Sequence, residues 1–471
     1  MHSVHPARLS TIATLAAPAI AAQLLQTGVI YADRVMLGHF SGGALAAMQI
    51  AGPLEWTLVS VSSAFAVGTL SLVGRAYGGG DRDAVRLHTT VALVVAIVLG
   101  VAVSLVALGM LPLLPILFPH ASRAPGGAID LARAYFEVAL FAAPFYCFGV
   151  AGFAAMSACR DTVTPLKIGL VVNVVHLGIN YALIGGNLGF PVMGARGAGV
   201  STVVSYALEA ALTIAALSRA KHVATVRPFV WPFRGGSESV GRRALRELRA
   251  LSGPATSERA IYHAGYIAFV WMIARLGDDA MAANQALIAI EAISFMTVEG
   301  FATACASLVA QELGAGRVAH AKKVGWMSTA LSVSTLSTFG VAFFVLRDRL
   351  PALVTPRLDL QAMAASALVV MAIAQPFMAT GVVLGQGLRG AGGTRVALVV
   401  SLVAGFGVRL VATWIATERL HLGVSGVWWG STMDWGVRSI LLVGIWRSGR
   451  WLHAKPDDAR GVVAIEAGVE A

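Results

Sequence analysis

The sequence has few charged residues and very few cysteines, and both shortages limit the classes of protein to which it can belong. Only 13% of its 471 residues are Asp, Glu, Lys or Arg, whereas a soluble protein is about a quarter charged. Its three cysteines, Cys147, Cys159 and Cys305, show no CxxC spacing and do not indicate a metal site or a disulfide framework. We expect them to be buried small apolar residues.

The sequence also lacks the motifs of an ATP-driven pump and of an enzyme. Its glycine-rich stretches, GRAYGGGDRDAVR and AQELGAGRVAHAKK, contain no Gly-Lys-Ser/Thr, and no strand pattern precedes them. We interpret them as helix ends and tight turns. No HExxH motif occurs among the 11 histidines. A membrane-embedded enzyme is therefore a remote alternative, and no cofactor is expected.

Long apolar runs are abundant: 57% of the residues are hydrophobic, and the mean hydropathy is +0.75. These values are typical of helical membrane proteins, whose backbone must satisfy its own hydrogen bonds. Twelve runs exceed the ~20 residues that cross a bilayer. They cover 11–38, 44–74, 86–117, 131–157, 164–188, 197–218, 250–274, 281–310, 322–346, 360–386, 395–416 and 424–446. No cleavable signal peptide is evident, and the fold class is all-α membrane protein.

The net charge of +11 could suggest a nucleic-acid partner, but the distribution of the charge argues against one. If the N-terminus is cytoplasmic, the inner connections hold 23 Lys and Arg and the outer connections hold 9. This asymmetry is the positive-inside rule. We expect a multi-pass protein of the cell's inner membrane with both termini in the cytoplasm, in contact with lipid and not with nucleic acid.

The chain repeats itself without a gap at an offset of 236 residues. The matched pairs are Pro18 with Pro254, Gln49 with Gln285, Glu55 with Glu291, Leu72-Val73 with Leu308-Val309, and Gly78 and Gly80 with Gly314 and Gly316. At an offset of 232, Pro144-Phe145 matches Pro376-Phe377, Gly149 matches Gly381, and Thr162 matches Thr394. Repeated membrane units are typical of secondary transporters.

The repeat predicts two lobes, 1–218 and 250–450, separated by a cytoplasmic linker over 219–249. The linker ends in RRALRELR, which has the pattern of a short interfacial amphipathic helix. The tail over 451–471 turns acidic and is expected to be disordered. Four prolines interrupt spans at repeat-equivalent places and are hinge candidates: Pro18, Pro144, Pro254 and Pro376.

Several stretches together resemble the multidrug and toxic compound extrusion (MATE) family. They are LAAPAIAAQLLQTGVIYADRVMLGHF, ALAAMQI, LVGRAYGGGD, LSGPATSE, AMAANQALIAIEAISFM, LVAQELGAGR, QGLRGAGGTR and GVWWGSTMDW. The resemblance implies twelve helices in two six-helix lobes with a V-shaped cavity. It also implies export of organic cations and other amphiphiles in exchange for protons or sodium ions. The IEAISFM stretch is more similar to the DinF-like branch than to the NorM-like branch.

Asp33, in VIYADRVML, is the first candidate for ion coupling. It matches the first-helix aspartate of the family, and a carboxyl group in an apolar setting can exchange a proton. Its place late in the span, beside Arg34, is also compatible with a solvated helix end. Asn173, His176 and Asn180 follow on the fifth span at spacings that share one helix face.

Some family members carry a carboxylate at the position of Asn180, so a two-carboxylate ion cage is doubtful here. His176 can instead carry a proton or pack as a polar residue. Sodium remains possible at Asp33 and Asn180. Thr202 matches a threonine of the family's ion pocket, although a lone helical threonine more often bonds to its own backbone.

The substrate cavity is expected to involve acidic and aromatic groups within the spans. Glu55 and Glu291 share the repeat register, Glu258 either lines the cavity or pairs with Arg259, and Glu299 lies in mid-span. The full set of candidates is Tyr31, Glu55, Asn173, Glu258, Tyr262, Glu291 and Glu299. Tyr262 occupies the place of a NorM-like glutamate, which weakens the case for a sodium site in this lobe.

The leading hypothesis is a monomeric, proton-coupled antiporter of small organic cations or amphiphiles. A flippase for lipid-linked precursors, from the same superfamily, is the alternative. Such flippases tend to need cationic cavity residues for pyrophosphate. Only Arg259 and Arg409 lie near the spans of the second lobe, which argues against the flippase.

Overall fold

The computed structural model describes residues 6–40, 42–118, 127–219, 222–234, 239–449 and 451. Every regular element of these residues is a helix, and none is a strand. The all-α prediction is therefore confirmed. The predicted disorder of 451–471 falls, apart from residue 451, outside the described residues.

The described residues of the first copy form nine α-helices and three short 3₁₀ turns. They are α1 Leu9–Phe40, α2 Gly42–Ser63, α3 Ala66–Gly78, α4 Arg82–Met110, η1 Leu111–Leu113, α5 Leu114–Leu117, α6 Ala128–Ala139, η2 Leu140–Ala142, α7 Ala143–Ala158, α8 Val163–Gly185, η3 Asn187–Gly189 and α9 Gly194–Leu217. Each of the first six predicted spans coincides with one of these helices or with two in series.

Where the structure describes the second copy, it forms seven α-helices. They are α10 Val240–Ala274, α11 Asp278–Gly314, α12 Val318–Val345, α13 Leu358–Gly390, α14 Thr394–Leu402, α15 Arg409–Trp414 and α16 Gly423–Ser448. Three short elements join them: the 3₁₀ turn η4 Pro351–Leu353 and the π-helical η5 Val403–Val408 and η6 Ile415–Arg419. The two π-helical turns lie on either side of α15.

Ten segments of the described chain are long and apolar enough to cross a membrane. The other two predicted spans correspond to α10 and α16, which have 35 and 26 residues. Their length suffices, but charged side chains lower their hydropathy: Glu258 and Arg259 in α10, and Asp434 and Arg438 in α16. The count of twelve is therefore supported by composition for ten spans and by length for two.

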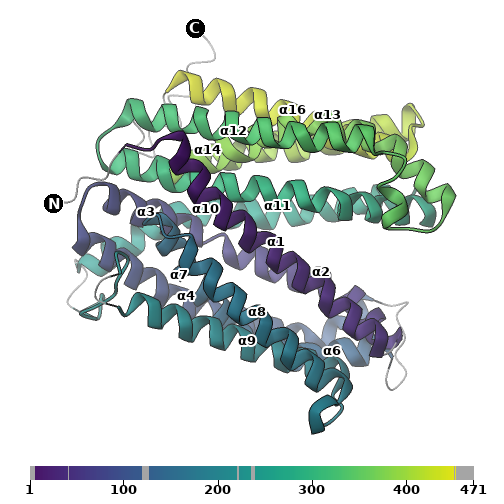
Figure 1. The fold of residues 1–471 in the computed structure, drawn as a ribbon, viewed down its shortest axis with the longest axis horizontal. Helices are drawn as coiled ribbons and strands as arrows, with labels where there is room; N and C mark the ends of the chain where they lie inside the picture. The colour runs from purple at the N-terminus through teal and green to yellow at the C-terminus, as the bar shows by residue number, and fades with distance from the viewer. Residues whose placement is uncertain are drawn as a thin grey trace. The chain divides into compact units, whose positions relative to one another are not determined.

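The chain divides into two compact units, each described here by itself. The N-terminal unit holds the described residues of 21–73 and 81–248, and the C-terminal unit those of 1–20, 74–80 and 249–471. In the N-terminal unit α8 packs along α9, and α4 packs along α7 (Figure 1). In the C-terminal unit α13 is central and contacts α11, α12 and α16. The predicted lobe boundaries remain a prediction.

Buried apolar side chains fill each unit. In the C-terminal unit Met378, Leu388 and Trp446 belong to one cluster that is almost fully excluded from solvent. In the N-terminal unit Ala132 and Phe136 of α6 pack with residues of α1, α2 and α9. Cys147, Cys159 and Cys305 are free and buried, as expected.

Two repeat-related glycines make a reciprocal contact within the C-terminal unit. A methyl group on Gly78 would overlap the carbonyl group of Gln311, and one on Gly314 would overlap that of Arg75. Only glycine lets the two backbones approach so closely. After each helix the chain turns at a glycine with positive φ, Gly80 at 75° and Gly316 at 72°. The prediction of helix ends and tight turns here is confirmed.

The hinge candidates occupy two kinds of position. Pro18, Pro254 and Pro376 lie inside α1, α10 and α13, whereas Pro144 lies in the first turn of α7, directly after η2. The division between the two units falls two residues after Pro18, at Ile20. The RRALRELR stretch is not a separate helix: it forms the first turns of α10, which continues into the seventh predicted span.

Candidate ion site in the N-terminal unit

Asp33 and His176 meet in the N-terminal unit, although 143 residues separate them. Nε2 of His176 lies 3.1 Å from Oδ1 and 3.0 Å from Oδ2 of Asp33. The amide of Asn180, one turn further along α8, donates a hydrogen bond of 2.6 Å to Oδ1. Asp33 is seven residues from the end of α1 and its side chain is 29% exposed, so it does not lie at a solvated helix end.

Two serines of α9 hold the other side of the imidazole ring. Nδ1 of His176 lies 3.0 Å from Ser205 Oγ and 3.1 Å from Ser201 Oγ. Ser201 also donates to the backbone oxygen of His176. Asn180 is fully buried, and among the described residues its Oδ1 has no hydrogen-bond partner, so one acceptor remains open beside the carboxylate of Asp33.

This arrangement can hold and move a proton. A carboxylate and an imidazole in direct contact can share one proton, and the serines can adjust to either tautomer because a hydroxyl group both donates and accepts. The open oxygen of Asn180 and the carboxylate of Asp33 could also serve a hard cation. Nε2 already contacts both carboxylate oxygens, which leaves few oxygen ligands for such an ion.

A pocket lies in the same unit, lined by Glu55 and by side chains of α4, α6, α7 and α9. Tyr135 of α6 donates a hydrogen bond of 2.9 Å to Oε2 of Glu55. Tyr146 and Tyr206 meet edge-on in the pocket wall, with ring centroids 5.2 Å apart. Thr202 lines the pocket, and its hydroxyl donates to the backbone oxygen of Ala198.

Two further predicted residues, Asn173 and Tyr31, lie close in sequence to His176 and Asp33 but are not part of the ion site. Asn173 is half-buried on α8, one turn before His176, and makes no hydrogen bond to Asp33 or His176 within the described residues. Tyr31 is 44% exposed on α1, two residues before Asp33. Both are accessible for a ligand, but neither shapes the ion site.

The carboxylate of Glu258 pairs with Arg389 in the C-terminal unit, and its neighbour Arg259 adds a smaller electrostatic attraction. Nε of Arg389 lies 3.2 Å from Oε2 of Glu258, and a second guanidinium nitrogen reaches Oε1. Ser401 of α14 donates to the same carboxylate. Both charged side chains are largely buried, with 15% and 12% exposed, so the pair ties α10 to α13 within the C-terminal unit.

A second ionic cluster surrounds Asp434 of α16. Nε of Arg409 lies 3.1 Å from Oδ2, and a guanidinium nitrogen of Arg438 lies 2.9 Å from Oδ1. Arg409 also donates to Ser431 at 2.8 Å, and Arg438 donates to Ser401 at 3.0 Å. The Asp434 carboxylate, 2% exposed, is thus shared by two cations.

The remaining candidates of the C-terminal unit differ in their surroundings. Tyr262 is exposed and stacks on Tyr266, with ring centroids 6.4 Å apart. Glu291 interacts electrostatically with Arg409. Glu299 is half-buried on α11, and its carboxylate has no hydrogen bond within the described residues.

Sequence reasoning missed the partners that complete both sites. They are Tyr135, Ser201 and Ser205 in the N-terminal unit, and Arg389, Ser401, Asp434 and Arg438 in the C-terminal unit. The pair Asp434 and Arg438 had a readable signal, because an acid and a base four residues apart inside an apolar run indicate a buried ion pair.

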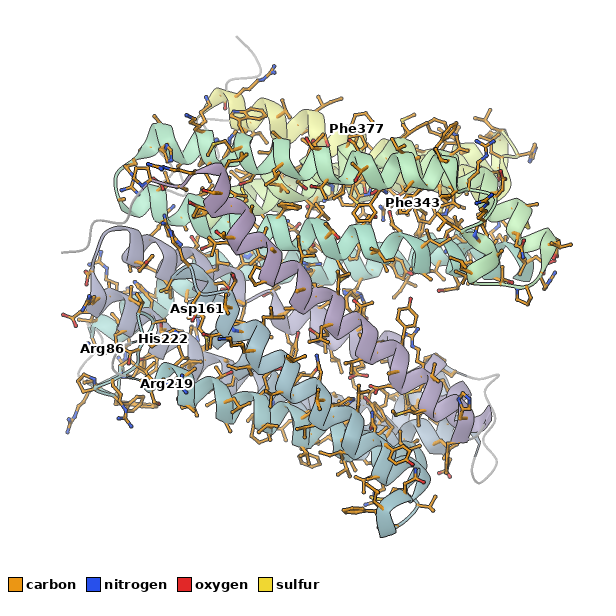
Figure 2. The ribbon with its side chains drawn as sticks, in the orientation of Figure 1. Arg86, Asp161, Arg219, His222, Phe343 and Phe377 are labelled. Atoms are coloured by element: carbon orange, nitrogen blue, oxygen red, sulfur yellow. The ribbon has the colours of Figure 1, made fainter. Side chains whose placement is uncertain are left out.

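A third polar pair lies outside the candidate spans. Nε2 of His222 lies 3.0 Å from Oδ2 of Asp161, which precedes α8 and accepts a hydrogen bond from the backbone of Thr164 (Figure 2). Burial acts to raise the pKa of Asp161, but the hydrogen bonds from His222 and Thr164 outweigh it and lower the pKa to about 2. The pair connects His222 of the predicted linker to the segment that leads into α8.

Known proteins share both the sequence and the fold of this chain. The MatE family model matches residues 18–182 and 254–415, which correspond to the two copies of the repeat. A probable multidrug resistance protein NorM of Thermotoga maritima is 26% identical over 440 residues, covering 93% of this chain and 92% of that protein. Its counterpart from Bradyrhizobium diazoefficiens is 26% identical over 447 residues, covering 91% of each chain.

Solved structures agree with the helical fold. An outward-facing multidrug resistance MATE family transporter superposes with a TM-score of 0.83 at 18% identity, covering 94% of this chain and 95% of that one. A Vibrio cholerae MATE transporter in a bent form also gives 0.83, at 17% identity, with 95% and 98% covered. The DinF-like branch remains a prediction. The family consists of multidrug efflux transporters and not of enzymes. This chain belongs to the MatE family of multi-pass membrane transporters.

Proposed function

We propose that this protein is a proton-coupled antiporter that exports organic cations and other amphiphilic molecules. The observation that carries the proposal is the direct contact between His176 and both carboxylate oxygens of Asp33. A proton that arrives at this pair neutralises the carboxylate, and its departure restores a negative charge within the membrane. That change in charge can favour one conformation over another, as alternating access requires.

The preference for a proton over sodium rests on the shortage of oxygen ligands. The imidazole occupies both carboxylate oxygens, and Asn180 stands where some family members carry a second acid. Sodium at Asp33 and Asn180 is the alternative ion, supported by the open Oδ1 of Asn180. An outcome in favour of sodium would leave the location of the site unchanged.

The proposed substrates follow from the multidrug resistance names of the relatives and from the chemistry of the pocket. Glu55 supplies an acidic group that attracts cations, and Tyr146 and Tyr206 supply aromatic faces. A flippase for pyrophosphate-linked lipids is disfavoured, because Arg389, Arg409 and Arg438 are engaged by acidic partners. We further propose a monomer in the inner membrane with both termini in the cytoplasm.

The test is ethidium efflux from vesicles that contain the purified protein, driven separately by a pH gradient and by a sodium gradient. We expect efflux with the pH gradient alone, and a decrease of at least ~10-fold for Asp33→Asn, because the amide cannot exchange a proton and a positioned acid–base group typically contributes ~10²-fold or more. Asp83→Asn is the matched control, since this aspartate is 89% exposed at the start of α4.

Two outcomes would contradict the proposal. Undiminished transport by Asp33→Asn would remove Asp33 from the coupling site. Efflux driven by sodium without a pH gradient would replace the proton by sodium. Full activity of Asp83→Asn would confirm that a general loss of acidic charge is not responsible.

A further inference from the structure

Arg409 contacts two side chains of the C-terminal unit, as His176 contacts two in the N-terminal unit, but the partners differ in chemistry. His176 contacts Asp33 on one side and Ser205 on the other. The guanidinium of Arg409 lies over the ring of Phe269, 5.5 Å from its centroid, and its Nε lies 3.1 Å from Oδ2 of Asp434.

The repeat register relates these two sets of residues. The ungapped offset of 236 pairs Asp33 with Phe269, and Glu55 with Glu291. Thr162 and Thr394 are 232 apart, and the π-helical turn η5 then adds one residue to the second copy, since a π turn takes five residues where an α turn takes four. The offset of 233 that follows pairs His176 with Arg409.

A pair of glycines shows how the last helix of the first copy, α9, aligns with the last helix of the second copy, α16. Gly197 packs against the backbone carbonyl of Leu183, and Gly426 packs against that of Ala416. Leu183 and Ala416 are 233 residues apart, so they are equivalent by the offset that follows η5. The two glycines that pack against them are 229 residues apart, so the offset between the copies changes to 229 in the last helix. The offset of 229 along this helix pairs Ser205 with Asp434.

The two related sites carry different charges. The first copy has a titratable acid, Asp33, beside a titratable base, His176. The second copy has an aromatic ring at the position of the acid and a guanidinium at that of the imidazole. Arginine keeps its proton in proteins, so its charge cannot be exchanged. Arg409 is 14% exposed, forms an ion pair with Asp434 and interacts electrostatically with Glu291.

We infer that Arg409 is a built-in cation that permanently fills the ion site of the second copy. Glu291 and Asp434 therefore need no exchangeable ion, and coupling is confined to the Asp33–His176 pair. The inference rests on the proposed function in treating that pair as the coupling site. Arg409 is a positioning and specificity-determining residue in this account, because it decides which copy can exchange an ion.

Removing the guanidinium should create a vacancy that a free cation can fill. The experiment measures the Tm of full-length protein in detergent, in the Asp33→Asn background so that the first site cannot respond. Arg409→Ala should lower the Tm by about 5 °C, because it leaves buried acids short of a counter-charge. Methylguanidinium chloride should restore at least half of this loss, whereas choline chloride, which is too large for the vacancy, should not.

Three variants keep the test decisive. Arg409→Lys retains the charge and should show a smaller loss without a response to methylguanidinium. If Arg409→Ala does not fold, Arg409→Gln keeps a hydrogen-bond donor for Ser431 and should give the same specific rescue. Adding Asp434→Asn to Arg409→Gln removes the acid and should abolish the rescue.

An unchanged Tm in Arg409→Ala, or no rescue by methylguanidinium in either charge-removing variant, would overturn the inference. Rescue that persists after Asp434→Asn and after Glu291→Gln would also overturn it. None of these readouts depends on transport. A failure of the Asp33 assignment would instead appear as undiminished efflux by Asp33→Asn, so the two failures are distinguishable.

Discussion

The hydroxyl group of Tyr135 donates a hydrogen bond to the carboxylate of Glu55, with 2.9 Å between the two oxygens. This bond joins α6 to α2 at the pocket of the N-terminal unit. Tyr135→Phe removes the donor without changing the ring. We expect the variant to lose about 1–2 kcal/mol of stability, because a half-buried carboxylate loses its partner. Thermal unfolding in detergent measures the loss.

The same pair tests the substrate pocket. Glu55→Gln keeps the hydrogen bond but removes the charge, so we expect a several-fold higher KM for a cationic dye and a smaller effect on a neutral amphiphile. Tyr181→Phe is the control, since Tyr181 is 53% exposed on α8. Equal effects of Glu55→Gln on both substrates would show that its charge has no part in binding.

His176 provides a test of how many groups take part in proton exchange. His176→Gln retains polar contacts for Asp33 and the two serines but cannot take up a proton. We expect the rate of driven efflux, measured from about pH 5.5 to pH 8.5, to lose one ionisation step while some proton-driven transport persists. A pH profile identical to that of the wild type would mean that His176 only positions Asp33.

The Asp161–His222 pair predicts a pH-dependent loosening near the start of α8. The pKa of Asp161 is lowered to about 2 in the fold, so its ion pair stabilises the protein above the ordinary pKa of about 4. That contribution is lost as the pH falls from about 4 towards 2. His222→Gln removes the imidazole that hydrogen-bonds to the Asp161 carboxylate and should move the loss to higher pH.

Hydrogen–deuterium exchange of the segments around Asp161 and His222 measures this transition as a function of pH. His39→Gln is the matched control, because His39 is exposed and its ring contacts only the backbone of Val35 in the described residues. The same midpoint in the wild type and in His222→Gln would contradict the assignment of the stabilisation to this pair.

The glycine contact between α3 and α11 predicts two substitutions that destabilise the protein equally. Gly78→Ala and Gly314→Ala should each lose about 1–3 kcal/mol, because the added methyl group overlaps a backbone carbonyl that cannot turn away. Gly169→Ala, in open space on α8, should be neutral or should gain up to about 1 kcal/mol from helix propensity. Thermal unfolding of the three variants measures these changes in stability. Unequal losses in Gly78→Ala and Gly314→Ala would contradict the prediction.

Much of the fold could be predicted from the sequence because the apolar runs are long and the repeat needs few gaps. The grouping of His176 and Asn180 was also readable, since their spacing alone puts them on one helix face. The seventh and twelfth spans are the least certain by composition, because charged residues such as Glu258 and Asp434 lie within them.

The partners of these groups could not be predicted, because they come from helices distant in the sequence. Arg389 reaches Glu258 across 131 residues, and Tyr135 reaches Glu55 across 80. Such pairs depend on the rotation and packing of each helix, which hydropathy does not determine. Arg259, the nearest charged neighbour in sequence, acts on Glu258 only through a smaller electrostatic attraction than Arg389 does.

The reciprocal glycine contact also bears on the origin of the chain. Gly78 contacts Gln311, which is the repeat copy of Arg75, and Gly314, the repeat copy of Gly78, contacts Arg75 itself. This exchange is the signature of an isologous, two-fold interface in a homodimer. Two separate half-length polypeptides could have made it before their genes were fused. A split at the linker, with the halves co-expressed, should therefore reassemble around these glycines.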